Sequence, residues 1–263
     1  MTPDIFNKLK EVYTFARTHC AAYKDLPESV TADQWKSVPV SSADTLRAAS
    51  SLLTYPEKDV RYVISEFSTA HPENLFLVPR RIDEPWPLLT AEIDEIKPFV
   101  AAYLAPLFWQ VAPIFYATFR AKSVPVSVLA PRNLPLAVQV MKEARAEMVV
   151  STPEVAEELQ AMLAKENLEK QIRAWHLIVP FGTEVKPPVL NGLYMVEYHL
   201  FPGVPVARML QGGAIEPLPG IYFEVSEQGT CLISSLEKHA LPLVRYDSGV
   251  RIARKEKNTF LFI

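Results

Sequence analysis

Segments with strand-like and helix-like patterns alternate through the middle of the chain, and this alternation constrains the fold most. Apolar runs of strand length occupy residues 124–129, 148–150 and 174–179. Helical patterns occupy residues 134–145 and 153–163 between them. Strands joined by helices of this length form right-handed βαβ units whose strands lie parallel in one sheet. The sequence therefore predicts an α/β fold with a mostly parallel sheet and flanking helices.

A β-hairpin is predicted near the carboxyl end of the chain. Residues 221–225 alternate apolar with more polar side chains, Gln228-Gly229 provides a turn, and the apolar residues 231–233 return. This pattern is typical of two antiparallel strands with one buried face. A loop that contains Arg245-Tyr246 follows. A C-terminal β-hairpin subdomain is therefore expected in addition to the parallel sheet.

The amino-terminal third of the chain has its own helix and strand patterns. Apolar residues recur at helical spacing over residues 5–16, behind a Thr2-Pro3-Asp4 start that suits a helix N-terminus. Residues 61–67 have the pattern of a strand. Residues 68–74 are expected to form a loop whose first residues cap a following helix.

The next part of the chain is rich in proline. Residues 79–87 form a charged, proline-rich connector, and a helix is predicted to begin at Thr90, which is followed by an acidic first turn. The apolar segment 99–119 is interrupted by Pro106 and Pro113. Buried helices, or a helix broken in the middle, are therefore expected there rather than a membrane span.

Composition excludes several classes of protein. The net charge is −3 and no block of Lys and Arg is present, so no nucleic-acid partner is expected. Cys20 and Cys231 lie far apart and outside any Cys-x-x-Cys pair, which favours two reduced thiols over a disulfide or a zinc site. The amino terminus lacks the pattern of a signal peptide, and a cytoplasmic location is expected.

Two stretches carry a resemblance to a known family. In residues 144–185, a strand leads to the Thr152-Pro153 corner, and a later strand ends at the Gly182-Thr183-Glu184 turn. In residues 220–251, a hairpin precedes the Arg-Tyr loop. This order resembles the adenylate-forming (AMP-binding) superfamily, in the branch of phenylacetate-CoA ligases and acyl-protein synthetases. The resemblance implies the large domain of these enzymes without their C-terminal lid, because the chain stops soon after the hinge region.

The phosphate-binding loop of that family is altered here. The resemblance places a glycine-rich loop after the strand at 61–67, where its backbone amides would wrap the phosphates of ATP. Residues 68–74 contain no glycine, while Pro72 lacks an amide proton and Glu73 would repel phosphate. A polyphosphate site is therefore not expected. The chain is therefore expected to form one compact unit with three segments. Residues 1–123 are a helical preface that includes the degenerate nucleotide loop, residues 124–190 are a βαβ core, and residues 191–263 are a β-rich C-terminal subdomain.

Two further family motifs have lost their acids. The Tyr-Gly-x-Thr-Glu-Gly signature is matched by residues 198–203, in which Phe201 stands for the threonine and Pro202 for the magnesium-binding glutamate. Neither replacement offers the side-chain oxygen that magnesium prefers. In the loop that begins at Arg245, Val250 stands for the aspartate that grips the ribose hydroxyls. Neither a metal site nor a catalytic residue is therefore expected.

The residues that remain mark a candidate nucleotide or acyl pocket. The resemblance implies that Thr183, Glu184, Tyr198, Arg245 and Tyr246 border it. Two alternatives stay open, since the glycine before Thr183 can simply end a strand and Arg245 can anchor the hairpin loop through a salt bridge.

Two polar residues beside the signature need separate consideration. His199 has no second histidine or acid at ligand spacing, so a hydrogen-bonded structural histidine is predicted rather than a metal ligand or an acid–base group. Glu197 is disfavoured as a substitute for the missing acid. In an alternating strand it shares a face with Met195 and opposes Val196.

These observations predict a non-adenylating homologue of acyl-CoA and acyl-protein synthetases that acts as a binding or partner subunit. No ATP-dependent ligase activity is expected of the chain alone, and no cofactor, although weak AMP or ATP binding stays open. The alternative is an adenylate-forming or acyl-transferring ligase with a rearranged site, completed by a partner chain. A third hypothesis is that a cleft lined by Tyr198, Tyr222 and Tyr246 binds a small carboxylate or acyl ligand through Arg245. A protein partner and a homo-oligomer both stay open.

Overall fold

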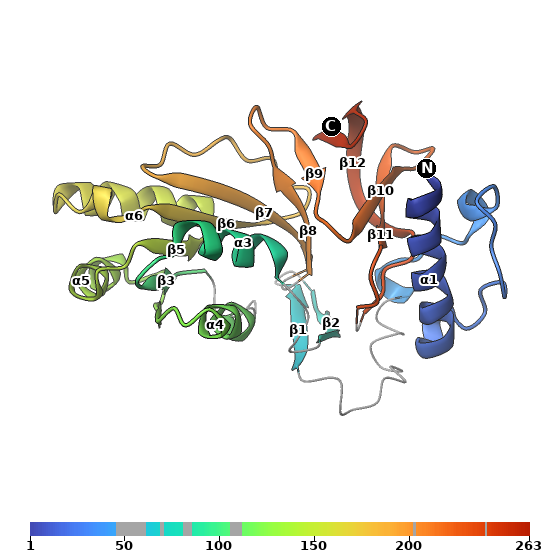
Figure 1. The fold of residues 1–263 in the computed structure, drawn as a ribbon, viewed down its shortest axis with the longest axis horizontal. Helices are drawn as coiled ribbons and strands as arrows, with labels where there is room; N and C mark the ends of the chain where they lie inside the picture. Colours follow the sequence, from blue (N-terminus) through green and yellow to red (C-terminus); the bar gives the residue numbers. More distant parts are fainter. Residues whose placement is uncertain (46–61, 69–70, 81–85, 106–111, 202–203, 240) are drawn as a thin grey trace. The chain divides into compact units, whose positions relative to one another are not determined.

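The protein is described here by a computed structural model that covers residues 1–45, 62–68, 71–80, 86–105, 112–201, 204–239 and 241–263 (Figure 1). It divides into two compact units. Unit 1 combines Met1–Glu84 with Ala214–Ile263, and unit 2 is Pro85–Gly213. Unit 1 thus joins the two ends of the chain, and within it the amino-terminal helix packs on the strand Thr230–Ser235, a long-range contact that no local pattern reveals.

Unit 2 is an α/β sheet with flanking helices. In sheet order its strands are β8 (Val204–Met209), β7 (Leu193–Phe201), β6 (Ala174–Pro180), β5 (Met148–Ser151), β3 (Ala101–Tyr103) and β4 (Val126–Val128). Neighbours from β7 to β4 pair in parallel, and β8 runs antiparallel to β7. The helices are α3 (Pro87–Ile96), α4 (Ala112–Ala121), α5 (Leu134–Ala144) and α6 (Pro153–Lys165). The predicted mostly parallel sheet is confirmed.

Local sequence explains the ends of two of these helices. Asn133 caps α5, because its side chain accepts a hydrogen bond from the amide of Leu136 at 3.3 Å. Arg145 ends α5 in the left-handed conformation, with φ of 54°. Thr152 precedes α6, and Pro153 occupies its first turn, where no amide donor is needed. The helices and strands predicted between residues 124 and 179 are confirmed to within a few residues.

Two predictions in unit 2 are wrong in part. Within the apolar segment 99–119, which is predicted to hold buried helices or a broken helix, α4 is helical, but Ala101–Tyr103 forms β3, paired on both sides with β4 and β5. A central parallel strand is buried on both faces, so it lacks the alternation that would identify it. The helix predicted to begin at Thr90 begins at Pro87 instead, since proline is well suited to a first helical turn. Residues 106–111 lie outside the described residues.

Unit 1 combines the amino-terminal helix with an antiparallel sheet. Its elements are α1 (Pro3–His19), η1 (Ala21–Tyr23), η2 (Trp35–Ser37) and, in sheet order, β10 (Ile221–Val225), β11 (Thr230–Ser235), β12 (Tyr246–Glu256), β13 (Thr259–Phe262) and β9 (Ile215–Pro217). Thr2 caps α1 through a bond from the amide of Ile5. The predicted first helix and the β10–β11 hairpin are confirmed.

The segment around residue 70 differs from its prediction. β1 (Tyr62–Ser68) pairs antiparallel with β2 (His71–Arg80), so a second strand stands where a loop into a helix was expected. The apolar core of β2 is short, and a short apolar run does not distinguish strand from helix. The tip of this hairpin, residues 69–70, and most of the predicted connector, residues 81–85, lie outside the described residues. Within the parts of the chain that are described, no helix is long and apolar enough to cross a bilayer.

Candidate functional site

A cluster of ionisable side chains lies inside unit 2, between the sheet and α3. In the parallel register of β6 and β7, His176 pairs with Met195, and Glu197 lies two residues further along. Alternation along the strands therefore directs His176, Glu197 and His199 to the same face of the sheet. Helix α3 contributes Glu92 and its N-cap residue Trp86 to that face. We call these five residues the buried polar cluster.

The cluster is joined by short contacts. Nδ1 of His176 lies 2.7 Å from Oε2 of Glu92, and Nε2 of His176 lies 3.7 Å from Oε1 of Glu197. The same Oε1 accepts a hydrogen bond from Nε1 of Trp86 at 2.9 Å and lies 2.7 Å from Nε2 of His199. His176 thus stands between two carboxylates, one from α3 and one from β7.

Burial and charge act in opposite directions on these groups. His176 and Glu197 are both 0% exposed. Burial on its own lowers the pKa of His176, but the Glu197 and Glu92 carboxylates outweigh it and raise that pKa to about 10. Burial likewise raises the pKa of Glu197, yet His176 and His199 together lower it to about 2. The arrangement therefore favours an ionised Glu197 beside a protonated His176 at neutral pH.

Aromatic rings enclose the cluster. The ring of Phe115 on α4 lies 4.5 Å from that of Trp86 and 5.7 Å from that of His176, measured between centroids. The Trp86 ring lies 5.3 Å from the ring of His199. Nε2 of His176 and Oε2 of Glu197 have no hydrogen-bond partner among the described residues. Over the same residues, no group of three His, Cys, Asp or Glu side chains is arranged to hold a metal ion.

The structure confirms the predictions for Glu197 and His199 but contradicts one premise. Glu197 shares a face with Met195, as predicted, and His199 is hydrogen-bonded, as predicted. The premise that His199 lacks an acidic partner is wrong, because Glu197 of the same strand contacts it. Sequence reasoning did not identify His176 or Glu92. The only available signal was a histidine at position 176 within an otherwise apolar strand, and α3 could not be paired with that strand from the sequence.

Three predicted pocket residues lie in unit 2, at the carboxyl ends of β6 and β7. Thr183 and Glu184 are exposed in the turn after β6, where Gly182 has a φ of 95° that favours glycine. Tyr198 on β7 is buried, and its ring meets that of Phe181 edge-on at 6.5 Å. Burial and the nearby Glu184 carboxylate raise the pKa of Tyr198 to about 12. These three residues are therefore near one another.

The signature segment is part of the sheet. Tyr198 pairs with Val179 of β6 and with Ala207 of β8, so the strand is hydrogen-bonded along both edges. A strand paired in this way has few backbone amides left for an anion. Pro202 and Gly203 lie outside the described residues.

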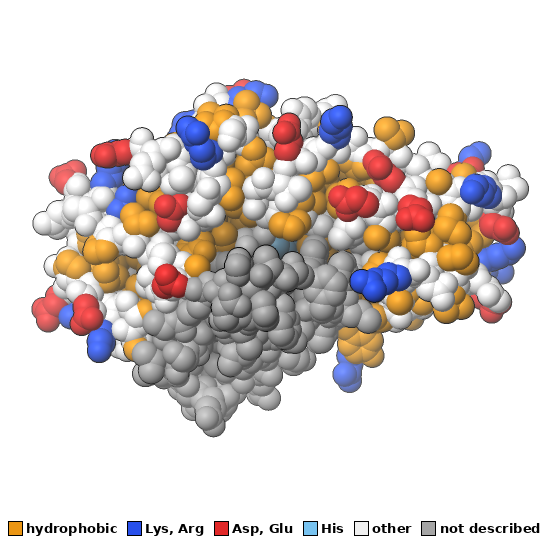
Figure 2. Space-filling view, turned by 180° about the vertical axis from the view of Figure 1, so that it is seen from behind, with side chains coloured by type: hydrophobic (Ala, Val, Ile, Leu, Met, Phe, Trp, Pro, Cys, Tyr) orange, Lys and Arg blue, Asp and Glu red, His pale blue; other side chains and the backbone are white. Residues whose placement is uncertain are grey.

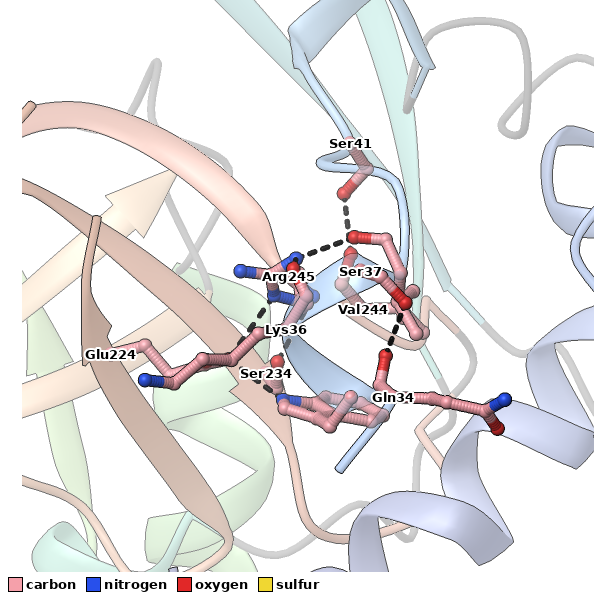
Figure 3. Close-up of polar contacts among 10 residues, drawn as sticks. Gln34, Lys36, Ser37, Ser41, Glu224, Ser234, Val244 and Arg245 are labelled. Atoms are coloured by element: carbon pink, nitrogen blue, oxygen red, sulfur yellow. Dashed lines mark hydrogen bonds and ion pairs between the residues drawn. The ribbon is translucent and has the colours of Figure 1, made fainter. Parts of the chain in front are cut away.

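The other two predicted pocket residues, Arg245 and Tyr246, lie in unit 1. The guanidinium of Arg245 donates to the carbonyl of Lys36 at 2.7 Å and to that of Val38, and its Nε lies 3.4 Å from Oε2 of Glu224 (Figure 3). Arg245 is 8% exposed. The structure thus shows the salt bridge to the hairpin that was the alternative for Arg245, together with a clasp on residues 36–38.

Further bonds hold the same segment to the carboxyl end of the chain. Oγ of Ser41 donates to the carbonyl of Val244 at 2.8 Å (Figure 3). The amide of Ser41 donates to the carbonyl of Arg245 at 3.1 Å, and the amide of Arg245 donates to Oγ of Ser234 at 2.9 Å. Arg245 adopts a φ of 44°, which is uncommon for a residue with a side chain. These contacts over-determine its position.

The segment predicted to be a ribose-binding loop is a strand beyond Arg245, because β12 begins at Tyr246. Oδ1 of Asp247 accepts a bond from the amide of Gly249 at 2.9 Å, and Oγ of Ser248 donates to the carbonyl of Cys231. Val250 continues strand β12. A separate hollow of about 600 Å³ lies along α1 between Asn7 and Lys238, and none of the predicted pocket residues lines it. Figure 2 shows basic and acidic side chains interspersed over the described part of the face that it draws.

Comparison with known proteins identifies the fold. No family model matches the sequence, and no curated protein matches it. Among solved structures, 2-hydroxyisobutyryl-CoA ligase in complex with 2-HIB-AMP matches with a TM-score of 0.67 at 13% identity, covering 98% of this chain and 65% of that chain. VinN matches with a TM-score of 0.57 at 14% identity, covering 100% of this chain and 77% of that one.

A third match has the same character. Coronafacic acid ligase from Pectobacterium brasiliense matches with a TM-score of 0.52 at 14% identity, covering 82% of this chain and 49% of that one. The chain thus spans about two thirds of the length of 2-hydroxyisobutyryl-CoA ligase, namely 65%. At these identities the likeness shows a shared fold.

Proposed function

We propose that this chain, which has the fold of AMP-forming acyl-CoA ligases, is a non-adenylating relative of those enzymes that acts as a binding or partner subunit. The observation that carries the proposal is the state of Glu197, the acid nearest to the magnesium position of the resemblance. Glu197 is completely buried and already bonded to Trp86 and His199. A carboxylate committed in this way is not available to a hydrated magnesium ion.

The residues present do not fit ATP and magnesium. The resemblance assigns the magnesium and ribose contacts to positions 202 and 250, where proline and valine offer no side-chain oxygen. Arg245 is occupied by Glu224 and by two backbone carbonyls. Losing a charge-assisted bond to a ligand costs about 1.5–3 kcal/mol, which is roughly tenfold to hundredfold in affinity for each bond.

A binding role has its own structural support. Thr183 and Glu184 are exposed after β6, with Tyr198 close by. The carboxyl ends of parallel strands are where open α/β sheets place their ligands. We infer that this edge of unit 2 is the surface at which an acyl group or a partner protein binds, in the manner of the phenylacetate-CoA ligase branch.

The test is an exchange assay for adenylation. Purified protein is incubated with ATP, magnesium, labelled pyrophosphate and a panel of acyl and aryl carboxylates, and label entering ATP is measured. The proposal predicts no exchange above the protein-free background. Exchange that depends on one of the carboxylates would overturn it.

The alternative is a ligase whose rearranged site is completed by another chain. It is favoured by the exposed Thr183 and Glu184 at the carboxyl end of β6, the edge at which open α/β sheets bind their ligands. The variant that carries both Pro202→Glu and Val250→Asp distinguishes an inherited pocket from a lost one. If AMP binds the double variant tenfold or more tightly than the wild-type protein, the pocket is inherited and the alternative gains support. Unchanged binding favours the non-adenylating proposal.

A further inference from the structure

The buried polar cluster links one helix to the sheet of unit 2, and the proposed function uses only the bonds of Glu197 to Trp86 and His199, not the position of His176 between Glu92 and Glu197. Glu92 and Trp86 lie on or next to α3, whereas His176, Glu197 and His199 belong to β6 and β7. The contacts between Glu92 and His176 and between Trp86 and Glu197 both cross from α3 to the sheet. Apart from these polar contacts, the buried face of α3 is apolar, with Leu88, Leu89, Ile93 and Ile96.

The protonation state of His176 decides whether both carboxylates face a proton-bearing nitrogen. Protonated imidazole carries a proton on each ring nitrogen, so it donates a hydrogen bond to Glu92 from Nδ1 and faces Glu197 from Nε2 as an ion pair at 3.7 Å. Neutral imidazole donates from one nitrogen only, and the other nitrogen then presents a lone pair to the remaining carboxylate. Because His176 is completely buried, water cannot replace the lost donor without movement of the surrounding elements.

We propose that the buried polar cluster is a proton-operated latch: a protonated His176 bridges Glu92 and Glu197 and holds α3 on the sheet, and loss of that proton loosens α3. The cluster acts as an ionic bridge and not as a metal centre, since its members do not converge as ligands among the residues that the structure describes.

The surroundings of His176 agree with this assignment. Helix α3 presents the carboxylate of Glu92, and β7 presents Glu197 and, beyond it, His199. Strand β8 places Arg208 at the register position opposite Glu197. Helix α4 presents the uncharged ring of Phe115. The two carboxylates dominate, and they raise the pKa of His176 to about 10, so the latch is closed at neutral pH and opens in the alkaline range.

Hydrogen exchange of the full chain tests the latch. Protection factors of the amides of α3, corrected for the intrinsic effect of pH, are measured from pH 6 to 10.5 with α5 as an internal reference. We expect the protection of α3 to fall at least tenfold more than that of α5 as the pH rises. Equal pH dependence of the two helices would overturn the latch.

Matched variants of α3 sharpen the test. Glu92→Gln removes the buried charge, and we expect the pH midpoint of α3 loosening to move down by about one unit or more, as for loss of a neighbouring opposite charge. Asp94→Asn removes a charge from the same helix, but there the carboxylate pairs with Lys122 at the surface, so the midpoint should stay in place. Identical midpoints in all three proteins would contradict the proposal.

Two wild-type measurements keep the test independent of any variant that fails to fold. The imidazole nitrogen shifts of His176 in an NMR titration should report a protonated ring through pH 8, and a midpoint near pH 6.5 would overturn the latch. Added zinc should leave the melting temperature unchanged. A zinc-dependent rise in the melting temperature that is lost in His176→Gln would identify a metal site and overturn the latch.

Discussion

Glu197 lies at the centre of the buried polar cluster. Its Oε1 accepts from Trp86, contacts His199 and faces His176 at 3.7 Å. A buried carboxylate has lost its hydration, so it is stable in the ionised form only while its hydrogen-bond and ion-pair partners are present. Removing one partner of a buried ion pair therefore costs more than the pair itself contributes.

Substitution of Glu197 by glutamine should destabilise the protein by about 3 kcal/mol, the lower end of the range for breaking a buried pair. Glutamine keeps an acceptor for Trp86 but leaves His176 with a single carboxylate. Urea denaturation at pH 7 measures the effect. The control is Glu157→Gln on the exposed side of α6, which should change stability by less than about 0.5 kcal/mol. Equal effects of the two substitutions would contradict the account of Glu197.

The pKa directions of the same residues set the pH dependence of stability. The raised pKa of His176 contributes stability that is complete below its ordinary value of 6.5 and is lost as the pH rises towards about 10. The lowered pKa of Glu197 contributes stability that is complete above its ordinary value of 4.5 and is lost as the pH falls towards about 2. The urea midpoint should therefore be highest between these two ordinary values. A midpoint that keeps rising from pH 7 to 9 would show that His176 is not protonated in the native state.

Single residues also show the limit of sequence reading. That Glu197 shares a face with Met195 follows from strand alternation, and the structure agrees. That Glu197 meets His176 depends on strand register and on the docking of α3, which joins residue 92 to residue 176. Neither local pattern nor spacing encodes such a pairing.

At the scale of elements, the segment from Trp35 to Ser41 is held to the C-terminal sheet by a set of hydrogen bonds in which Arg245 takes part. Arg245 donates to the carbonyls of Lys36 and Val38, while Nε1 of Trp35 donates to Glu224 at 2.9 Å, the same carboxylate that pairs with Arg245. A planar guanidinium can satisfy these acceptors together, whereas an ammonium cannot. The clasp therefore depends on arginine itself and not only on its charge.

Arg245→Lys should accordingly lower stability by about 1–3 kcal/mol and reduce the amide protection of residues 36–41. Thermal or urea unfolding gives the first quantity, and hydrogen exchange gives the second. Arg251→Lys, at an exposed position on β12, the strand that follows Arg245, is the matched control and should leave both unchanged. If lysine at position 245 behaves like lysine at position 251, the clasp is not specific to the guanidinium.

Elements between residues 124 and 179 could be predicted because their patterns are local. Capping residues, proline in the first turn and apolar periodicity all agree there, as in α5 and α6. The strand predicted at residues 61–67 is confirmed as β1, whereas β2 and β3 could not be predicted in the same way. The run within β2 is short, and β3 is buried on both faces, so neither has the period that separates strand from helix.

At the scale of the whole molecule, the chain keeps the fold of the enzymes that it resembles, whereas residues at their expected binding positions are altered. The fold is that of AMP-forming acyl-CoA ligases, with a TM-score of 0.67 to 2-hydroxyisobutyryl-CoA ligase. The order of strands and helices carries that likeness at 13% identity, because a fold is specified by patterns of burial that many sequences satisfy. Site chemistry depends on particular side chains. For this reason the altered positions 202 and 250 support the proposed loss of adenylation even though the frame is kept.

The measurement that tests this claim most directly is calorimetric titration of the purified protein with ATP and magnesium and, separately, with AMP, accompanied by thermal shift. We predict no saturable heat and no change in melting temperature with either nucleotide at concentrations up to about a millimolar, since several of the family's phosphate, magnesium and ribose contacts are missing. Saturable one-to-one binding in the micromolar range would contradict the account, because it would mean that the altered segments still form a nucleotide pocket.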